Sequence, residues 1–314
     1  MDLRQLNTFL QVAELGSLSR AADRLRIAQP ALSRQIRLLE EELRVPLFTR
    51  HGRGMVPTPA GDLLRSRAGA ILRDIEDIRD ELIQEAGAVR GRVVFGMPPT
   101  VGGVLATRLI DRFLMAHPDV TLRVVQAFSG YLLEWLQGGE IDVAVVYGTE
   151  AAASVRLSPL LVENLCFLTT PDAAPRPHHA IPFEEVARTK LILPAPQHGL
   201  RQLVEMAAHR AGTPLRIAVE ADDLQVIKEL VMKRLGATIL PLVAARADVD
   251  AGRLHAHPII DPHLSRKLMI AEPLGRRPTN AVRRFGAMLR DEVSAMVAGG
   301  LWDGQLLGTD KNPA

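Results

Sequence analysis

One stretch constrains the fold of this 314-residue chain more than any other: residues 59–89 have the pattern of a single long helix. Six apolar residues recur there at spacings of 4, 3, 4, 3 and 4, and many of the residues between them are charged: Leu64, Ala68, Ile71, Ile75, Ile78 and Leu82. A narrow apolar stripe of two residues in every seven requires a partner helix. We predict that this seam pairs two subunits; the alternative is that it packs onto the chain's own core.

The long helix separates two regions of different character. A chain of this length is expected to hold more than one domain, since a domain usually takes roughly 100–200 residues. We predict a helical domain at residues 1–58, the dimerisation helix at 59–89, an α/β domain at 91–301 and a flexible tail at 302–314. A glycine-containing break at 87–91 marks the change.

Residues 1–58 have the pattern of a winged helix-turn-helix. Apolar residues at helical spacing run from Leu3 to a stop at Gly16, and a second short helix covers Leu18–Leu25. Pro30 suits the first turn of a third helix, because proline has no backbone N–H to lose there. Two short apolar runs around a glycine-rich turn at 46–58 predict a β-hairpin, the wing.

The third helix carries two opposite faces. Leu32, Ile36 and Leu39 point inward, while Pro30, Ser33, Arg34 and Arg37 share the outer face. Arginine donates a fork of hydrogen bonds to guanine in the major groove, and a helix N-terminus favours phosphate. The predicted DNA contacts are Ser19, Arg20, Gln29, Pro30, Ser33, Arg34, Arg37 and, on the wing, Arg50 and Arg53. The alternative is a solvated arginine face on an ordinary helix.

The distribution of charge supports a DNA-binding face in residues 1–58 but not over the chain as a whole. The whole chain carries a formal charge of +2, which by itself indicates no nucleic-acid partner. Residues 1–58 contain nine arginines against six acidic residues, an excess of three positive charges. The basic character therefore lies in the segment that has the helix-turn-helix pattern.

Beyond residue 91, strands and helices alternate, which predicts a mainly parallel sheet with both faces covered. The predicted strands are Arg92–Gly96, Val120–Ala127, Ile141–Tyr147, Asn164–Thr169, Leu191–Leu193, Arg216–Glu220, Ala237–Leu240 and Lys267–Ala271. The predicted helices are Val101–His117, Ser129–Gln137, Leu200–Ala211, Leu224–Arg234 and Asn280–Val297.

Several of these segments together resemble the LysR-type transcriptional regulators. The resemblance is carried by residues 17–25 (SLSRAADRL), 29–36 (QPALSRQI), 47–50 (LFTR) and 58–61 (TPAG), and more weakly by 138–144 and 236–241. It implies a dimer through the long helix, assembled into a tetramer, and a periplasmic-binding-protein-like effector domain of two subdomains. On that template subdomain I covers 91–161 and 267–301, and subdomain II covers 162–266. Arg234 stands in a stretch where the family often carries glycine.

Ligands of open α/β sheets lie beyond the carboxyl ends of strands, near helix N-termini. Thr100, with the amides of Val101 and Gly102, follows the first strand, and Ser129 and Gly130 follow the next, so these residues can hold an anionic effector. Both groups match positions that line the effector cleft in the family that the chain resembles. Pro194, His198 and Arg201 open a helix of the second subdomain, and His198 or Arg201 can pair with a carboxylate. Plain helix capping is the alternative for Thr100 and Ser129.

The sequence gives little indication of a metal, cofactor or redox site. We expect no metal site, because His178 and His179 have no spaced carboxylate or cysteine beside them, and no cofactor, because nucleotide-binding and catalytic motifs are lacking. The single cysteine, Cys166, has no resolving partner for a redox sensor. The first residues lack a signal-peptide pattern and no long apolar run is present, so we expect a cytoplasmic protein without a membrane partner.

The sequence therefore favours a ligand-responsive transcription regulator that binds double-stranded DNA and itself, with RNA polymerase as a further candidate partner. Two alternatives remain at this stage. One is a solute-binding or carrier module whose N-terminal unit serves association. The other is a cytosolic enzyme, which the missing catalytic constellation disfavours.

Overall fold

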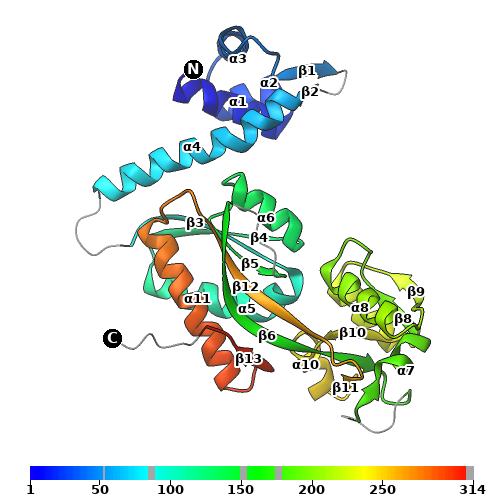
Figure 1. Cartoon of the computed structure of the whole chain (residues 1–314). Coiled ribbons are helices and arrows are strands. Elements are labelled where there is room, and N and C mark those ends of the chain that lie inside the picture. Colours follow the sequence, from blue (N-terminus) through cyan, green and yellow to red (C-terminus); the bar gives the residue numbers. More distant parts are fainter. Residues whose placement is uncertain (52–53, 84–88, 149–153, 174–178, 309–314) are drawn as a thin grey trace.

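The computed structural model describes residues 1–51, 54–83, 89–148, 154–173 and 179–308. A small helical domain with a two-stranded wing comes first, followed by one long helix, α4, and then by two α/β lobes (Figure 1). Two lobes of mixed sheet and helix behind a winged helix-turn-helix are the fold class that the sequence predicts, and this prediction is confirmed.

The N-terminal domain holds α1 (Leu3–Leu15), α2 (Leu18–Leu25), α3 (Gln29–Leu43), β1 (Phe48–His51) and β2 (Gly54–Pro57). Asp2 and Gln5 form a capping box at the start of α1, and Ser17 caps α2. Phe9 and Leu32 are fully buried in one apolar core that the three helices and the wing share. This core fixes which face of α3 is left exposed.

Helix α4 (Pro59–Ile83) begins where the Thr58 hydroxyl accepts a hydrogen bond from the Gly61 amide at 3.1 Å. The predicted end at residue 89 is wrong: Val89 is not helical, and residues 84–88 lie outside the described part. The predicted seam divides in two. Leu64 packs on the N-terminal core and Ala68 is buried, while Ile71, Ile75 and Ile78 are 42%, 38% and 55% exposed. The side chain of Leu82 lies outside the described part.

The first lobe is a three-layer unit. Its strands β3 (Gly91–Met97), β4 (Val120–Gln126) and β5 (Val143–Tyr147) run parallel, in the order β4-β3-β5. Helices α5 (Pro99–Ala116) and α11 (Asn280–Ala298) cover one face, and α6 (Ser129–Gln137) covers the other. The alternation of β3 explains this, since Val93 and Phe95 belong to the core under α5 and α11, and Val94 to the core under α6.

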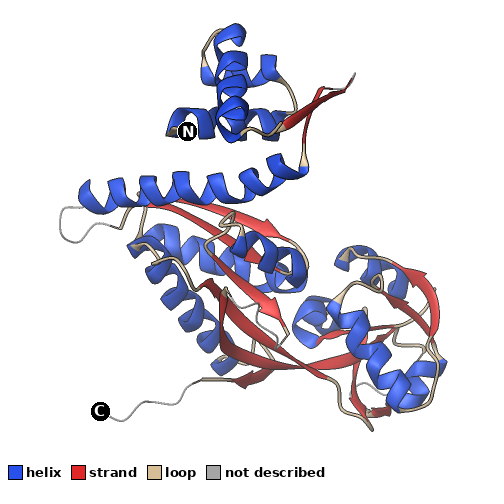
Figure 2. Ribbon diagram, turned by 45° about the horizontal axis from the view of Figure 1, so that its top comes forward, coloured by secondary structure: helices blue, strands red, loops and turns tan. Residues whose placement is uncertain are grey.

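Two long strands join the lobes. β6 (Val155–Thr169) and β12 (Ser265–Pro273) pair antiparallel, and β12 also pairs antiparallel with β5. The far half of β6 pairs with β10 (Thr238–Pro241) and β11 (His255–Ile260), again antiparallel. The predicted mainly parallel sheet is thus corrected to a mixed one (Figure 2). We keep the subdomain boundaries at 161/162 and 266/267 as a proposal, because both strands continue across them.

The second lobe has its own apolar core, built from β6, β8, β10 and β11 and the helices around them. Its remaining elements are β7 (Ile181–Pro182), α7 (Phe183–Arg188), β8 (Lys190–Leu193), α8 (Gly199–Arg210), β9 (Arg216–Glu220), α9 (Leu224–Met232) and α10 (Leu242–Asp250). The sequence pattern did not predict four of the elements of this lobe, because they are short or their apolar residues show no clear periodicity: β7, α7, α10 and β11. None of the helices described in this structure combines the length and the apolar character needed to cross a bilayer.

The prediction of a flexible tail from residue 302 is wrong for residues 302–308. β13 (Gly304–Leu306) pairs with β6, and the Trp302 side chain is 1% exposed. Residues 309–314 lie outside the described part. The polar, glycine-rich composition of this segment gives no sign of order. One buried tryptophan and three strand residues are nevertheless enough to hold the segment against β6.

Arg234 has a positive φ of 64°, the left-handed conformation that costs any residue with a Cβ more than it costs glycine. The departure from the family pattern at this position therefore falls on a strained backbone site. The Arg234 guanidinium also forms an exposed ion pair with Asp172.

Candidate DNA-binding face and effector site

The outer face of α3 is free of the domain core. Pro30, Arg34 and Arg37 are exposed, Ser33 is half-buried, and Leu32, Ile36 and Leu39 are buried on the opposite side. Arg37 has one exposed ion pair, with Glu41 at 3.5 Å, which is weak enough to be exchanged for another partner. The arrangement leaves guanidinium and hydroxyl groups of α3 available to donate hydrogen bonds to a DNA groove.

The start of α3 is tied to the start of α2. The Ser19 hydroxyl donates to the Gln29 side-chain oxygen at 3.2 Å, and the Arg20 guanidinium donates to the Leu15 carbonyl. Arg26 ends α2 in the left-handed conformation, with φ of 53°, which makes the turn between the helices tight. Four predicted contacts, Ser19, Arg20, Gln29 and Pro30, therefore lie at the helix starts and are exposed.

The wing is anchored to α3 through one carboxylate. Glu40 accepts hydrogen bonds from the amides of Leu47 and Phe48, at 2.7 and 3.2 Å. The wing is therefore held against the C-terminal half of α3. The Arg50 side chain and the whole of Arg53 lie outside the described part, so their predicted role in DNA contact stays a prediction.

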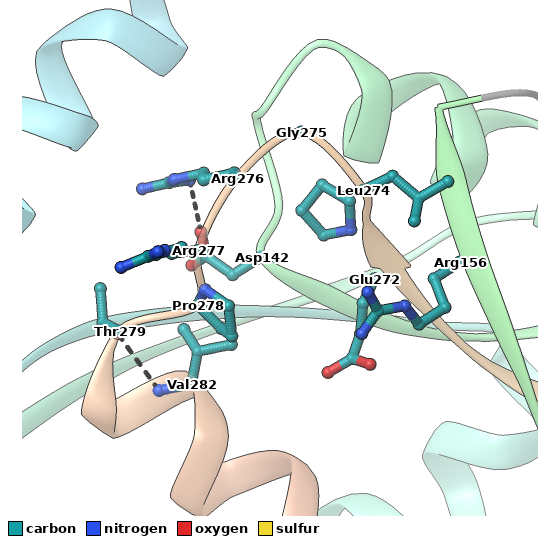
Figure 3. A pocket seen from close by; sticks show the side chains of 11 residues that line it. Asp142, Arg156, Glu272, Leu274, Gly275, Arg276, Arg277, Pro278, Thr279 and Val282 are labelled. Carbon is teal, nitrogen blue, oxygen red and sulfur yellow. Dashed lines mark hydrogen bonds and ion pairs between the residues drawn. The ribbon is translucent and has the colours of Figure 1, made fainter.

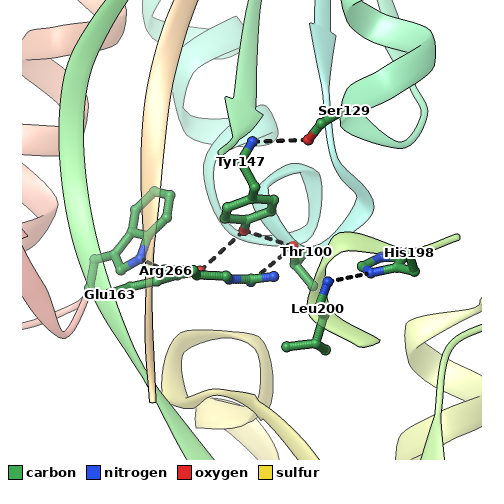
Figure 4. Close-up of polar contacts among 8 residues, drawn as sticks. Thr100, Ser129, Tyr147, Glu163, His198, Leu200 and Arg266 are labelled. Carbon is green, nitrogen blue, oxygen red and sulfur yellow. Dashed lines mark hydrogen bonds and ion pairs between the residues drawn. The ribbon is translucent and has the colours of Figure 1, made fainter. Parts of the chain in front are cut away.

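Thr100 lies in the first turn of α5 and is 8% exposed. Its hydroxyl is 2.9 Å from the Tyr147 hydroxyl and 3.4 Å from Nη2 of Arg266 (Figure 4). The amides of Val101 and Gly102, which we expected to hold an anion, both donate to the Pro98 carbonyl at 3.0 Å. That part of the expectation is wrong, since these amides already have partners; the Thr100 hydroxyl remains.

A buried carboxylate organises the groups around Thr100. Glu163 accepts hydrogen bonds from Nε of Arg266 at 2.6 Å and from the Tyr147 hydroxyl at 3.1 Å. Its other oxygen accepts from the Trp302 indole at 2.8 Å. Burial raises the pKa of the Tyr147 hydroxyl far above its ordinary value, with the Glu163 charge adding to the effect. The network thus contains one cation, one carboxylate and a neutral phenol.

Arg266 carries the one unpartnered donor of this network. Its side chain is 5% exposed, its guanidinium carbon lies 3.7 Å from the centre of the Tyr147 ring, and it pairs with Glu163. Among the described residues, its Nη1 has no hydrogen-bond partner. A buried N–H without a partner costs free energy, which an acceptor on a ligand would recover.

Ser129 begins α6, and its hydroxyl accepts a hydrogen bond from the Tyr147 amide at 2.9 Å. The predicted pair Thr100 and Ser129 therefore meets at Tyr147, from two strand ends of the first lobe. Gly130 is exposed, and a Cβ added to it would meet nothing within 4 Å. It leaves open space beside Ser129 without supplying a contact.

His198 approaches this group from the second lobe. It caps α8 by accepting a hydrogen bond from the Leu200 amide on Nδ1 at 3.1 Å, and its ring meets the Phe128 ring edge-on at 4.6 Å. Burial, with the nearby Arg266 charge, lowers its pKa to about 4. At neutral pH the imidazole is uncharged, so Nε2 carries the proton and can donate one hydrogen bond. It is not the cation that we expected to pair with a carboxylate.

Arg201 is not available to an effector, which corrects its predicted role. Nη1 donates to Glu220 at 3.0 Å and to the Pro194 carbonyl at 3.1 Å, and Nε donates to Glu205 at 2.8 Å. The arginine is 7% exposed and Pro194 is also buried, so both hold the start of α8 in place. Two carboxylates already offset the charge of Arg201.

Tyr147, Glu163, Arg266 and Trp302 were missed from the sequence. Tyr147 ends an apolar strand, the place where ligand-binding residues are expected in α/β folds, so that rule could have found it. Glu163 is a lone acidic residue within an apolar strand, a pattern that calls for a buried partner. Its partner Arg266 is a cross-strand neighbour 103 residues later, and no local pattern connects them.

Cys166 is buried, and burial raises the pKa of its thiol to about 11. The sulfur is therefore a protonated thiol at neutral pH, with little reactivity as a nucleophile. The Cys166 side chain packs in the apolar core of the second lobe.

Comparisons with known proteins cover both parts of the chain. Residues 3–62 match the bacterial regulatory helix-turn-helix protein family of the lysR type, and residues 86–294 match the LysR substrate binding domain. The chain is 31% identical over 304 residues to the HTH-type transcriptional regulator BbuR of Bordetella bronchiseptica, covering 97% of this chain and 94% of the relative.

It is also 31% identical over 271 residues to the nitrogen assimilation regulatory protein nac of Klebsiella aerogenes, covering 86% of this chain and 88% of that one. Among solved structures, a full-length OxyR variant of Pseudomonas aeruginosa superimposes with a TM-score of 0.73 at 27% identity, covering 93% of this chain and 94% of the other. The described helix-turn-helix, the two-lobed domain and these matches together place the chain in the LysR family of DNA-binding transcriptional regulators.

Proposed function

We propose that the protein binds a specific DNA site through the outer face of α3 and that a small molecule bound between the two lobes alters this binding. The observation that carries the first half is the exposed set Arg34 and Arg37 on a helix whose other face is fully buried. A helix presented in this way fits the major groove, where arginine discriminates guanine. Contact with RNA polymerase is a further part of this proposal, and a catalytic role is not.

Paired subunits supply two such helices. Ile71, Ile75 and Ile78 form an exposed apolar stripe on α4, and a stripe of that spacing is typical of a helix that pairs with another. A solved relative in fold, CbnR, is described as a full-length protein complexed with its target DNA. We propose a dimer through α4, assembled into a tetramer, on a site with two-fold symmetry.

The proposed effector site lies between Thr100 and Ser129 of the first lobe and His198 of the second, with Arg266 at its base (Figure 4). The charges there cancel, because Glu163 pairs with Arg266 and His198 is neutral. We had expected an anionic effector, but an anion would meet no free cation among these residues. The donors support a small polar molecule that accepts hydrogen bonds, which Nη1 of Arg266 and Nε2 of His198 supply.

The DNA-binding proposal is tested by gel-shift titration of the full chain against the DNA upstream of its own gene. We expect Arg34→Ala to weaken specific binding by about 1–3 kcal/mol, because it removes one base contact. The matched control is Arg216→Ala, an exposed arginine on β9 in the second lobe. Specific, salt-sensitive binding that both variants retain equally would overturn the role of α3.

The effector proposal is tested on the same DNA complex. A screen of small metabolites for a change in DNA binding identifies the effector, and Thr100→Val then removes the hydroxyl while keeping the shape. We expect the variant to need a higher effector concentration for the same response. A normal response would remove Thr100 from the site and leave the DNA-binding proposal intact.

A further inference from the structure

A separate cavity of about 260 Å³ lies in the first lobe, where the connection from β12 to α11 encloses space beside the strand β6 (Figure 3). Asp142, Arg156 and Glu272 line one part of it, and Arg276, Arg277 and Thr279 of the connection line the rest. None of these residues belongs to the effector site between the lobes. The cavity therefore requires its own explanation.

The charges around the cavity do not cancel. Arg276 pairs with Asp142 at 3.1 Å, and Asp142 also accepts a hydrogen bond from the Val94 amide at 2.8 Å. Arg156 faces Glu272 directly across the β6–β12 ladder. Arg277 is left over: within the described part of the chain it has no ion pair, and the lining carries three arginines against two carboxylates.

The backbone adds to this positive potential. α11 is 19 residues long, and its N-cap, Thr279, lines the cavity while accepting a hydrogen bond from the Val282 amide. The positive end of the helix dipole thus lies at the same wall as Arg277. Figure 3 shows Arg276 and Arg277 extending side by side beyond Asp142.

The connection from β12 to α11 is also held in a fixed conformation by contacts within the chain. Proline at 273 and at 278 restricts the backbone, and Nη1 of Arg283 donates to the Pro278 carbonyl at 3.0 Å. The Leu274 amide donates to the Ser154 carbonyl at 2.9 Å. Fixed donors lose less conformational entropy on binding than mobile ones do.

We propose that this cavity binds a small molecule carrying a phosphate group, or free inorganic phosphate, as a second site distinct from the effector site. Guanidinium groups match phosphate oxygens in a fork geometry, and a helix N-terminus favours the same anion. A phosphate has acceptor oxygens in more directions than a planar carboxylate has. It can therefore accept hydrogen bonds both from the Arg277 side chain and from the N-terminus of α11. The volume limits the ligand to a small body, since pockets for larger ligands exceed about 300 Å³.

The test is isothermal titration of the full chain with inorganic phosphate, with glycerol 3-phosphate and with acetate, at constant ionic strength. We expect saturable binding of one phosphate per chain, weakened about tenfold or more in Arg277→Gln, as for the loss of one charge-assisted hydrogen bond. Tighter binding of glycerol 3-phosphate than of inorganic phosphate assigns the site to a phosphorylated metabolite, and the reverse order assigns it to the free ion.

Two variants separate this site from general charge effects and from the effector site. Arg284→Gln removes an exposed arginine of α11 that does not line the cavity, and it should bind phosphate normally. Thr100→Val should also bind phosphate normally. Absence of saturable binding, an equal loss in Arg284→Gln, or acetate binding as tight as that of phosphate would each overturn the proposal. So would loss of phosphate binding in the DNA complex, which would indicate that DNA phosphate occupies the cavity.

Discussion

The outer face of α3 and the network around Glu163 both depend on arginine, but in opposite ways. Arg34 and Arg37 are exposed, and the ion pair between Arg37 and Glu41 is weak. Arg266 is buried and paired with Glu163, and its Nη1 has no hydrogen-bond partner among the described residues. A surface arginine keeps its donors for another molecule, whereas a buried one first needs partners within its own chain. The same residue type therefore predicts function at one site and mainly stability at the other.

The largest expected effect is on the buried side of this comparison. Glu163→Ala leaves the Arg266 charge without a counter-charge and the Trp302 indole without an acceptor. We expect a loss of about 3–5 kcal/mol in the free energy of unfolding, measured by urea titration. Glu14→Ala is the control, because it breaks the exposed pair with Arg24 and should cost at most about 1 kcal/mol. Equal losses in the two variants would show that burial does not distinguish the regions.

The exposed stripe of α4 gives the next effect, on association and not on the fold of the subunit. Ile75→Asp should weaken subunit association by about 3 kcal/mol or more per dimer, because two isoleucine side chains lose their burial. Analytical ultracentrifugation measures this, and the midpoint of unfolding at high dilution should stay unchanged. Leu63→Asp is the matched control, since Leu63 is 63% exposed on the same helix but outside the seam. A stronger effect of Leu63→Asp would move the dimer interface.

A smaller loss is expected when only one hydrogen bond of the network is removed. Trp302→Phe keeps most of the apolar packing but removes the indole N–H that Oε2 of Glu163 accepts at 2.8 Å. We expect a loss of about 1–3 kcal/mol in the free energy of unfolding, because one oxygen of a buried carboxylate loses its donor. If the variant were as stable as the wild type, the segment after α11 would not support the network.

The smallest effect is a pH dependence carried by His198. Burial lowers its pKa to about 4, below its ordinary value of 6.5. Between these values the unfolded chain takes up a proton that the folded chain does not, so stability falls as the pH falls from about 6.5 to about 4. Thermal unfolding at pH 7 and pH 5 should show a smaller decrease for His198→Gln than for the wild type. An identical decrease would mean that the pKa of His198 is not lowered in the folded chain.

Local patterns were sufficient for the helix-turn-helix. Helical spacing, the cap at Ser17 and the proline at the start of α3 each act within a few residues, so the sequence predicts which face of α3 stays exposed. The same holds for Thr100 and Ser129, because the residue after a strand and before a helix is recognisable locally. The mixed sheet was not predictable in this way, since β6 and β12 owe their direction to pairing across about 100 residues.

Arg201 and Arg266 show where the sequence stops being sufficient. Both are arginines near the ends of elements of the two-lobed domain, and we predicted a ligand role only for Arg201. Folding places Glu205 and Glu220 on Arg201, which removes Arg201 from the candidate site. Within the described part of the chain it leaves Nη1 of Arg266 unpartnered, which is why we propose Arg266 for that site. Helix periodicity, caps and turns are short-range properties, so the sequence by itself determined α3 and its exposed face. It did not show that Leu64 and Ala68 of the α4 seam are buried within their own chain. Which buried charges meet depends on contacts between distant strands, so the tertiary structure alone decided which residues form the candidate effector site.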